Sequence, residues 1–314
     1  MEISVKSILG IIFFCISFIG LLLNVLVAEP VFRLAINKEK STIFIIALVN
    51  IVTDIIHLVL ACFYLAPSII IQSYIVSDDK YSVATFIIGE IYMSCWYAGN
   101  VNHIVMTLNR FAVIFFRNDT LFSRRNVVIL LICNVLFSCT NGYIVQFVFP
   151  CCAFLLDHTV LSYSYYKING VKNWTGLSDI TLNVFSSVVP VVCYSMIIYV
   201  LRKKNKRIAG QKYASDKKKG KSREIMYTIQ FGIITFTFTI AWILFQTFPL
   251  FMLKWNVNWF ICIAFLNTFN SSTNAVVFLI CNSEVKNLLP KRIRANRTWS
   301  DETESRRTGN NSTK

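Results

Sequence analysis

Seven long stretches of this sequence are almost free of charged side chains. Two of them carry isolated ionisable groups, namely residues 41–77 with Asp54 and His57, and residues 81–109 with Glu90 and His103. The other five contain no acidic or basic residue: 7–28, 126–156, 180–201, 225–253 and 255–283. Because about 20 helical residues cross a hydrocarbon core of about 30 Å, each stretch can span a bilayer. Runs this continuous are not barrel strands. We therefore predict an all-α membrane protein, a bundle of seven transmembrane helices.

The basic residues divide unevenly between the connecting segments. If the N-terminus is outside, only five of the 31 Lys and Arg residues are external: Lys6, Lys80, Lys167, Lys172 and Lys254. Eleven others lie between residues 202 and 223 alone. The positive-inside rule then predicts an external N-terminus and a cytoplasmic C-terminus. The net charge of +15 is accordingly attributed to a surface facing anionic membrane lipid, and no nucleic-acid partner is expected.

The chain divides into a membrane domain, residues 1–289, and a polar tail, residues 290–314, which we expect to be disordered and cytoplasmic. The first apolar run is too long for the core of a signal peptide, so we expect it to be retained. The largest external loop, from about residue 150 to 176, contains Asn173-Trp174-Thr175. That triplet is a glycosylation acceptor on the outer face.

The ten cysteines do not indicate a disulfide framework. Most are expected inside helices, where cysteine commonly behaves as a small apolar residue: Cys15, Cys62, Cys133, Cys139, Cys193, Cys262 and Cys281. Cys151 and Cys152 open the external loop, in an oxidising compartment. Their partner is left open by the sequence, with Cys62 and Cys262 as candidates.

Isolated polar groups inside a membrane are costly and so are candidates for function. Asp54 is either a neutralised, hydrogen-bonded acid or part of a hydrated cluster with Asn24 and Asn274 that could hold a cation. Glu90 and Arg110 are 20 residues apart on one helix, a rise of about 30 Å. They are expected at the outer and inner edges of the membrane, and the alternative for both is snorkelling to solvent.

Sequence motifs of enzymes and metal sites are missing. The three histidines and 11 glycines form no HExxH, paired CxxC, GxSxG or phosphate-binding loop. Asp54 and His57 could suit a metal, but no further ligands accompany them. We expect neither enzymatic activity nor a cofactor. A multi-span transporter or channel for a small solute is the alternative function, although the prolines show no internal repeat.

The segment Leu108-Asn109-Arg110-Phe111 resembles the acid-Arg-Tyr motif of rhodopsin-like G-protein-coupled receptors. Asn24, Asp54, Pro190 and Asn274 match other landmarks of that class. More narrowly, the chain resembles the nematode chemoreceptors of serpentine receptor class x. That likeness is carried by His103 with residues 108–112, by the Cys151-Cys152 pair and by residues 270–274.

The resemblance implies a chemosensory receptor that binds a small-molecule or peptide ligand outside and activates a heterotrimeric G protein inside. It implies a plasma-membrane location, in a sensory neuron cilium, and leaves the oligomeric state open. Matching positions give the ligand-pocket candidates Glu90, Tyr92, Met93, Trp96, Asn183, Ser186, Trp242, Phe245, Gln246, Ala264 and Thr268. The alternative for each aromatic residue is ordinary helix packing. The set suggests a small, mostly neutral ligand, or a cation held by aromatic faces with Glu90 nearby.

The resemblance also implies a switch. Its residues are Asn109, Arg110, Phe111, Glu224 and Asn274. Asn109 replaces the acid that usually precedes the arginine, so Arg110 lacks its adjacent counter-charge. We hypothesise that Glu224, at the inner start of the sixth span, restrains Arg110 instead, through a pair worth about 0–1 kcal/mol if exposed. Ala275 and Phe278 replace the usual proline and tyrosine of the seventh span.

Overall fold

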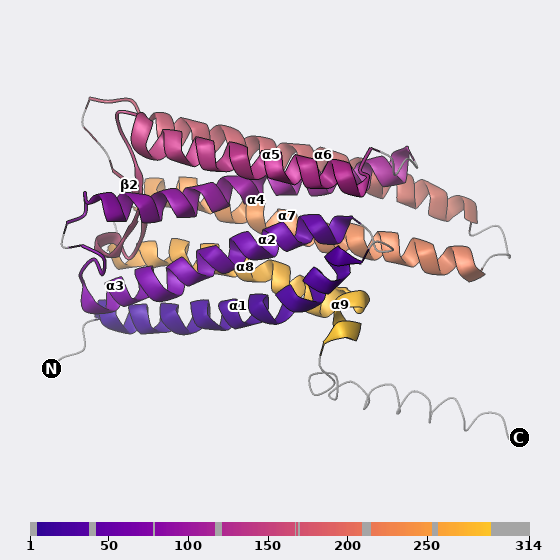
Figure 1. Ribbon diagram of the computed structural model, residues 1–314, viewed down its shortest axis with the longest axis horizontal. Coiled ribbons are helices and arrows are strands. Elements are labelled where there is room, and N and C mark those ends of the chain that lie inside the picture. Colours follow the sequence, from indigo (N-terminus) through magenta and orange to yellow (C-terminus); the bar gives the residue numbers. More distant parts are fainter. Residues whose placement is uncertain are drawn as a thin grey trace, which may run out of the picture.

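The computed structural model describes residues 5–37, 42–77, 79–116, 121–166, 168, 170–208, 215–252 and 257–289. Within 170–208 and 215–252, some residues are described by their backbone alone. The expected tail, residues 290–314, lies outside this description. Seven long helical segments run side by side along one axis (Figure 1). They are α1 (Val5–Ile36), α2 (Ile43–Leu60) continued by η1 (Ala61–Leu65) and α3 (Ala66–Ile71), α4 (Val83–Phe115), α5 (Arg124–Tyr143) continued by η2 (Ile144–Val148), α6 (Trp174–Ile208), α7 (Ser215–Met252) and α8 (Ile261–Cys281).

Short elements complete the described chain. Strands β1 (Phe154–Asp157) and β2 (Ser162–Tyr165) flank the 3-10 turn η3 (His158–Val160) in the loop after η2. The turn η4 (Val257–Phe260) precedes α8, and α9 (Ser283–Leu288) follows it. Asn282 caps α9, because its Oδ1 accepts hydrogen bonds from two backbone N–H groups of the first turn.

Within the described residues, six of the seven segments are long and apolar enough to cross a membrane, and α4 is the exception. Its buried residues include Asn100, Asn102, His103 and Arg110. Because α4 packs against α2, α5, α6 and β1, much of its surface faces protein, and that part can hold polar groups that a lipid-facing surface cannot. The predicted seven-helix bundle is confirmed, while the orientation of its termini stays a prediction.

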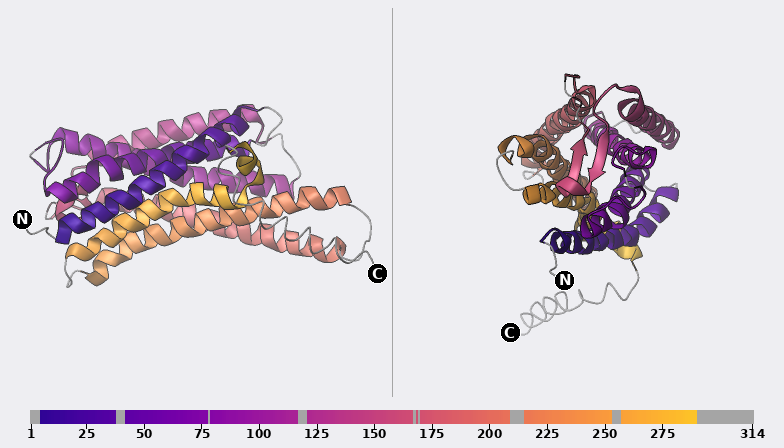
Figure 2. Two further views of the ribbon diagram at one scale, coloured as in Figure 1. Left: turned by 90° about the horizontal axis from the view of Figure 1, so that it is seen from below. Right: turned by 90° about the vertical axis from the view of Figure 1, so that its left-hand side faces the viewer.

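The helices form a closed ring. Each helix contacts the next in the order α1, α2, α4, α6, α7 and α8, and α8 contacts α1. Helix α5 packs outside this ring, against α4. The end-on view of Figure 2 shows this ring with the β1–β2 hairpin lying across it. The polarity of the ring is inverted relative to a soluble protein: Asn24 and Asn183 face inward at 0% exposure, whereas Phe185 is 63% exposed. A surface of this kind suits lipid.

Candidate functional site

The β1–β2 hairpin covers one end of the bundle. Its strands pair antiparallel, with Phe154 opposite Tyr165 and Asp157 opposite Ser162. Phe154 stacks on Tyr92 of α4 at 5.2 Å between ring centroids, and Tyr165 meets Phe245 of α7 at 6.0 Å. From the sequence we expected this segment to be only a loop. The hairpin therefore adds an aromatic roof to the space between α4 and α7.

Asp157 holds the tip of the hairpin to the loop after α3. Its carboxylate is 0% exposed and accepts hydrogen bonds from the Tyr74 hydroxyl at 2.9 Å and the Lys80 Nζ at 2.5 Å. The Thr159 N–H and hydroxyl and the Ser164 hydroxyl also donate to it. Burial by itself would raise the pKa of Asp157, but the bonds from Lys80 and Thr159 outweigh it and lower the pKa to about 2.

Gln146 holds the base of the hairpin. Its Oε1 accepts the Phe154 N–H at 3.0 Å, and its Nε2 donates to the Phe154 carbonyl at 2.8 Å and the Phe86 carbonyl at 3.1 Å. The Phe154 carbonyl also lies directly against Gly89 of α4, where a Cβ would overlap it. Glycine is therefore required at position 89 for the strand to approach α4 so closely.

A small inner cavity lies beneath this roof. Its volume is about 20 Å³, which is room for roughly one water molecule. The side chains around it come from α4, the hairpin, α6, α7 and α8: Tyr92, Met93, Trp96, Phe154, Tyr165, Asp179, Phe245 and Asn267. The wall is thus mostly aromatic, with one carboxylate and one amide.

Asp179 of α6 is the acidic group of the cavity and is 2% exposed. Its Oδ2 accepts hydrogen bonds from the Tyr165 hydroxyl at 3.0 Å and the Gln246 Nε2 at 3.2 Å. Its Oδ1 makes no hydrogen bond among the described residues. The Trp96 indole lies nearby but donates to the Asn183 Oδ1, at 3.1 Å.

A larger outer pocket of about 740 Å³ adjoins the inner cavity. Tyr165 and Phe245 line both spaces. The remaining side chains around the outer pocket come from the hairpin and its turn, from the loop before α6, and from α6, α7, η4 and α8, and include Leu177, Phe260 and Ile263. A molecule in the outer pocket can therefore contact the inner cavity past these two rings.

The structure brings together five of the eleven pocket candidates. Tyr92, Met93, Trp96 and Phe245 line the inner cavity, and Gln246 lines the outer pocket and binds Asp179. Of the other six, three are buried nearby without lining either space: Asn183, Ala264 and Thr268.

The last three candidates point elsewhere. Ser186 donates to the Asn183 carbonyl within α6, and Trp242 donates through Nε1 to the Ser187 hydroxyl at 2.6 Å. Glu90 accepts a hydrogen bond from Ser94 at 3.1 Å, on the side of α4 that meets Gly142 of α5. Glu90 therefore does not supply the negative charge of the cavity; Asp179 does.

Four wall residues were missed from the sequence: Phe154, Tyr165, Asp179 and Asn267. Asp179 was detectable, because it directly precedes an uncharged run and is therefore an acid at a membrane boundary. Phe154 and Tyr165 were not, since their position depends on pairing between β1 and β2.

The expected polar cluster forms in part. Asn274 donates to the Asp54 Oδ2 at 2.6 Å, whereas Asn24 donates to the Gly20 and Ser271 carbonyls at 3.0 Å each. Asp54 and Asn274 line a second cavity of about 20 Å³ with His57 and His103 among the other residues. His57 bonds to the Tyr92 carbonyl at 3.1 Å. No group of three metal-binding side chains occurs among the described residues.

Arg110 lies at the other end of α4 and is 2% exposed, so the snorkelling alternative is wrong for it. Its guanidinium carbon lies 5.8 Å from the ring centroid of Phe231 in α7, a cation–π distance. Asn109 is also buried, and Phe111 stacks on Phe115. The side chain of Glu224 lies outside the described part of α7, so the proposed Arg110–Glu224 pair is untested.

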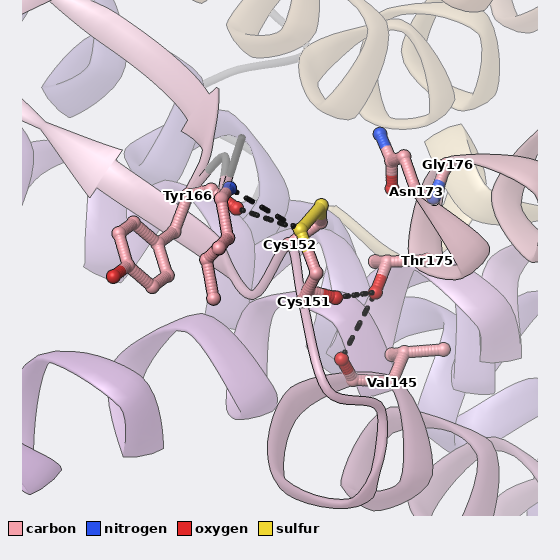
Figure 3. Close-up of a disulfide and its surroundings, with 8 residues drawn as sticks. Val145, Cys151, Cys152, Tyr166, Asn173, Thr175 and Gly176 are labelled. Carbon is pink, nitrogen blue, oxygen red and sulfur yellow. Dashed lines mark hydrogen bonds between the residues drawn. A yellow bond between two sulfur atoms is a disulfide. The ribbon is translucent and has the colours of Figure 1, made fainter. Parts of the chain in front are cut away.

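Cys151 and Cys152 form a disulfide with each other (Figure 3). Cys62 and Cys262 are free thiols, so both candidate partners proposed from the sequence are wrong. Beside this bond, the buried Thr175 hydroxyl donates to the Val145 carbonyl at 3.1 Å and the Cys151 carbonyl at 3.4 Å. The disulfide thus joins neighbours in the chain and fastens the start of β1 to no helix.

Asn173, the predicted glycosylation acceptor, lies on the rim of the outer pocket. Its Oδ1 accepts the Gly176 N–H at 2.7 Å in the first turn of α6. Figure 3 shows it next to Thr175 and Gly176, away from the disulfide. The side chain is partly exposed, and its glycosylation stays a prediction.

Comparison with known proteins places this geometry in a family. The family described as serpentine type 7TM GPCR chemoreceptor Srx matches residues 14–282. Squid rhodopsin has the same fold, with a TM-score of 0.74 at 16% identity over 91% of this chain and 85% of that chain. No curated protein matches.

Proposed function

The chain belongs to the Srx family of serpentine seven-transmembrane chemoreceptors, and we propose that it binds a small external ligand beneath the hairpin and activates a heterotrimeric G protein at the other end. The family and the rhodopsin-like fold identify the protein as a multi-pass G-protein-coupled receptor, a class of receptors and not of enzymes. The ligand, the G protein and the residues that serve them are the proposal.

One observation carries it: a row of three phenylalanines on α7 connects the two ends of the bundle. Phe245, Phe238 and Phe231 are seven residues apart, close to two helical turns, so they share a face. Phe245 lines the cavity. Phe238 lies 5.4 Å from Trp96 and 4.7 Å from His103, and Phe231 packs against Arg110.

Phe238 and Phe231 contact α4 directly, whereas Phe245 contacts Phe154 and Tyr165 of the hairpin. A ligand that displaces Phe245 would rotate or tilt α7 as a body, which changes the contact of Phe231 with Arg110. The ligand shifts the resting equilibrium only by its difference in affinity for the two arrangements. In this mechanism Asn109, Phe111 and Asn274 shape the inner end, and Glu224 supplies the counter-charge to Arg110 in the resting state.

The proposal includes the expected placement of the protein. Its N-terminus and Asn173 are outside, with a glycan on Asn173, and its tail is cytoplasmic. The protein resides in the plasma membrane, in a sensory cilium. The uneven distribution of basic residues supports the orientation, and the family supports the sensory role.

The test is nucleotide exchange on purified G proteins by membranes containing the receptor, screened against chemically diverse small molecules. Phe238→Leu should reduce ligand-stimulated exchange while sparing ligand binding. Phe236→Leu is the matched control, because Phe236 is on the same helix but 65% exposed, and it should change neither. Accumulation or current without nucleotide exchange would indicate the transporter alternative and end the receptor proposal.

A further inference from the structure

The acid of the inner cavity has half of its hydrogen-bonding capacity unused. The Tyr165 hydroxyl and the Gln246 amide both donate to Asp179 Oδ2, and the Asn183 amide and the Trp96 indole lie nearby. Asp179 Oδ1 is buried and makes no hydrogen bond among the described residues. A buried carboxylate oxygen left this way is costly, so the site is complete only when a donor occupies the cavity.

No Lys or Arg lies among the described residues that line the inner cavity. The nearest described base on the adjoining outer pocket is Lys172, whose Nζ lies 4.2 Å from the ring centroid of Trp174. Asp179 takes part in no ion pair with a described residue. Among the described residues Asp179 therefore has no counter-charge, and a cationic ligand can supply one.

The rest of the cavity wall suits a cation. Its rings are those of Tyr92, Trp96, Phe154, Tyr165 and Phe245. Aromatic faces attract ammonium groups, and the attraction grows in a site without water. The cavity volume of about 20 Å³ accepts a group about as large as a water molecule, which fits a primary ammonium and excludes a trimethylated one.

We propose that the ligand is an amphiphilic primary amine, with its ammonium group in the inner cavity against Asp179 and its apolar part in the outer pocket. This inference rests on the proposed function, because it names the ligand class of that site. The ammonium donates to Asp179 Oδ1 and lies near Asn267. The apolar part passes Tyr165 and Phe245, which line both spaces, and reaches Leu177, Phe260 and Ile263.

The experiment measures binding without a G protein. The full-length receptor in lipid nanodiscs is heated with each member of a series of primary amines, the n-alkylamines from butyl to octyl and 2-phenylethylamine. Each amine is paired with the alcohol of the same skeleton and with its trimethylammonium analogue. At least one amine should raise the melting temperature more than both partners do. If none exceeds its alcohol, the proposal is overturned.

Two variants locate the charge. Asp179→Asn keeps the size of the side chain. It should weaken the binding of the most stabilising amine at least about 30-fold, as expected for removing one partner of a buried charge pair. Binding of the matching alcohol should not change. Glu90→Gln removes the other acid near this end of α4 and should leave amine binding unchanged. Retained amine binding in Asp179→Asn, or its loss in Glu90→Gln, refutes the assignment.

The amine comparison on the unmutated receptor stands even if Asp179→Asn does not fold. The result is also separable from the proposed function. Amine binding without nucleotide exchange would contradict the receptor mechanism and leave the ligand class intact. Nucleotide exchange that is triggered by neutral molecules and unaffected by Asp179→Asn would contradict the ligand class and leave the receptor mechanism intact.

Discussion

Neutralising Asp157 should loosen the hairpin that covers the inner cavity. The Asp157 carboxylate is fully buried and bonds to Tyr74, Lys80, Thr159 and Ser164, so it joins the hairpin to the loop after α3. Asp157→Asn keeps the shape of the side chain. It removes the negative charge that attracts Lys80. It also replaces one of the accepting carboxylate oxygens by an NH2 group, which donates hydrogen bonds.

The pKa of Asp157 gives the magnitude. It is lowered from 3.8 to about 2, and one pKa unit corresponds to about 1.4 kcal/mol, so the charged form stabilises the hairpin by about 2.5 kcal/mol. This contribution is fully present above pH 3.8 and is lost as the pH falls through the folded-state pKa. Asp157→Asn should therefore raise the population of open hairpin about 60-fold at any pH from 5 to 7.

Hydrogen exchange of the hairpin amides, followed by mass spectrometry on the receptor in nanodiscs, measures that population. Peptides covering β1 and β2 should lose protection in Asp157→Asn, while peptides from α4 should not. Asp79→Asn makes the same charge change at an exposed neighbouring acid and should have no such effect. Equal protection in Asp157→Asn and the unmutated receptor would refute the pinning role. A difference that varies between pH 5 and 7 would refute the assigned pKa.

Three other predictions concern packing, topology and the switch. Gly89→Ala should displace the hairpin and weaken ligand binding, whereas Gly99→Ala in the same helix, with open space around it, should be neutral or stabilise by up to about 1 kcal/mol in thermal melting. Asn173→Gln should remove an N-linked glycan, seen as a mobility shift, and epitopes should place the N-terminus outside; reversed staining contradicts the orientation. Arg110→Ala should abolish nucleotide exchange with surface expression intact, and Glu224→Gln should raise basal exchange by at most about fivefold; unchanged basal exchange would exclude that pair.

The sequence predicted the spans because each depends on a local property, the length of an apolar run against the thickness of a bilayer. The resemblance to the receptor family, read position by position, pointed to Tyr92, Met93 and Trp96 of α4, and these three line the cavity. The burial of Arg110 was not predictable in this way. Whether a polar residue at a helix end meets solvent depends on how neighbouring helices surround it, and Arg110 lies on a side of α4 that other helices cover.

The ligand site depended most on long-range placement. Phe154 and Tyr165 reach the cavity only because β1 and β2 pair and fold across the ring. The strand sequences, Phe-Leu-Leu-Asp and Ser-Tyr-Ser-Tyr, differ in pattern, and the first lacks the alternation typical of a half-buried strand. Asp179 was visible as an acid beside an apolar run, but its partner Tyr165 was not, and the partner is what directs its carboxylate inward.

The disulfide between Cys151 and Cys152 has a kinetic consequence for the hairpin. Since the bond joins adjacent residues, it encloses no loop and cross-links the hairpin to no helix. The attachments of the hairpin to the bundle through Asp157 and Gln146 are hydrogen bonds, which break and re-form without chemistry. The hairpin is therefore able to lift as one body, and under the proposed function the residence time of a ligand would be set by how long those bonds stay closed together.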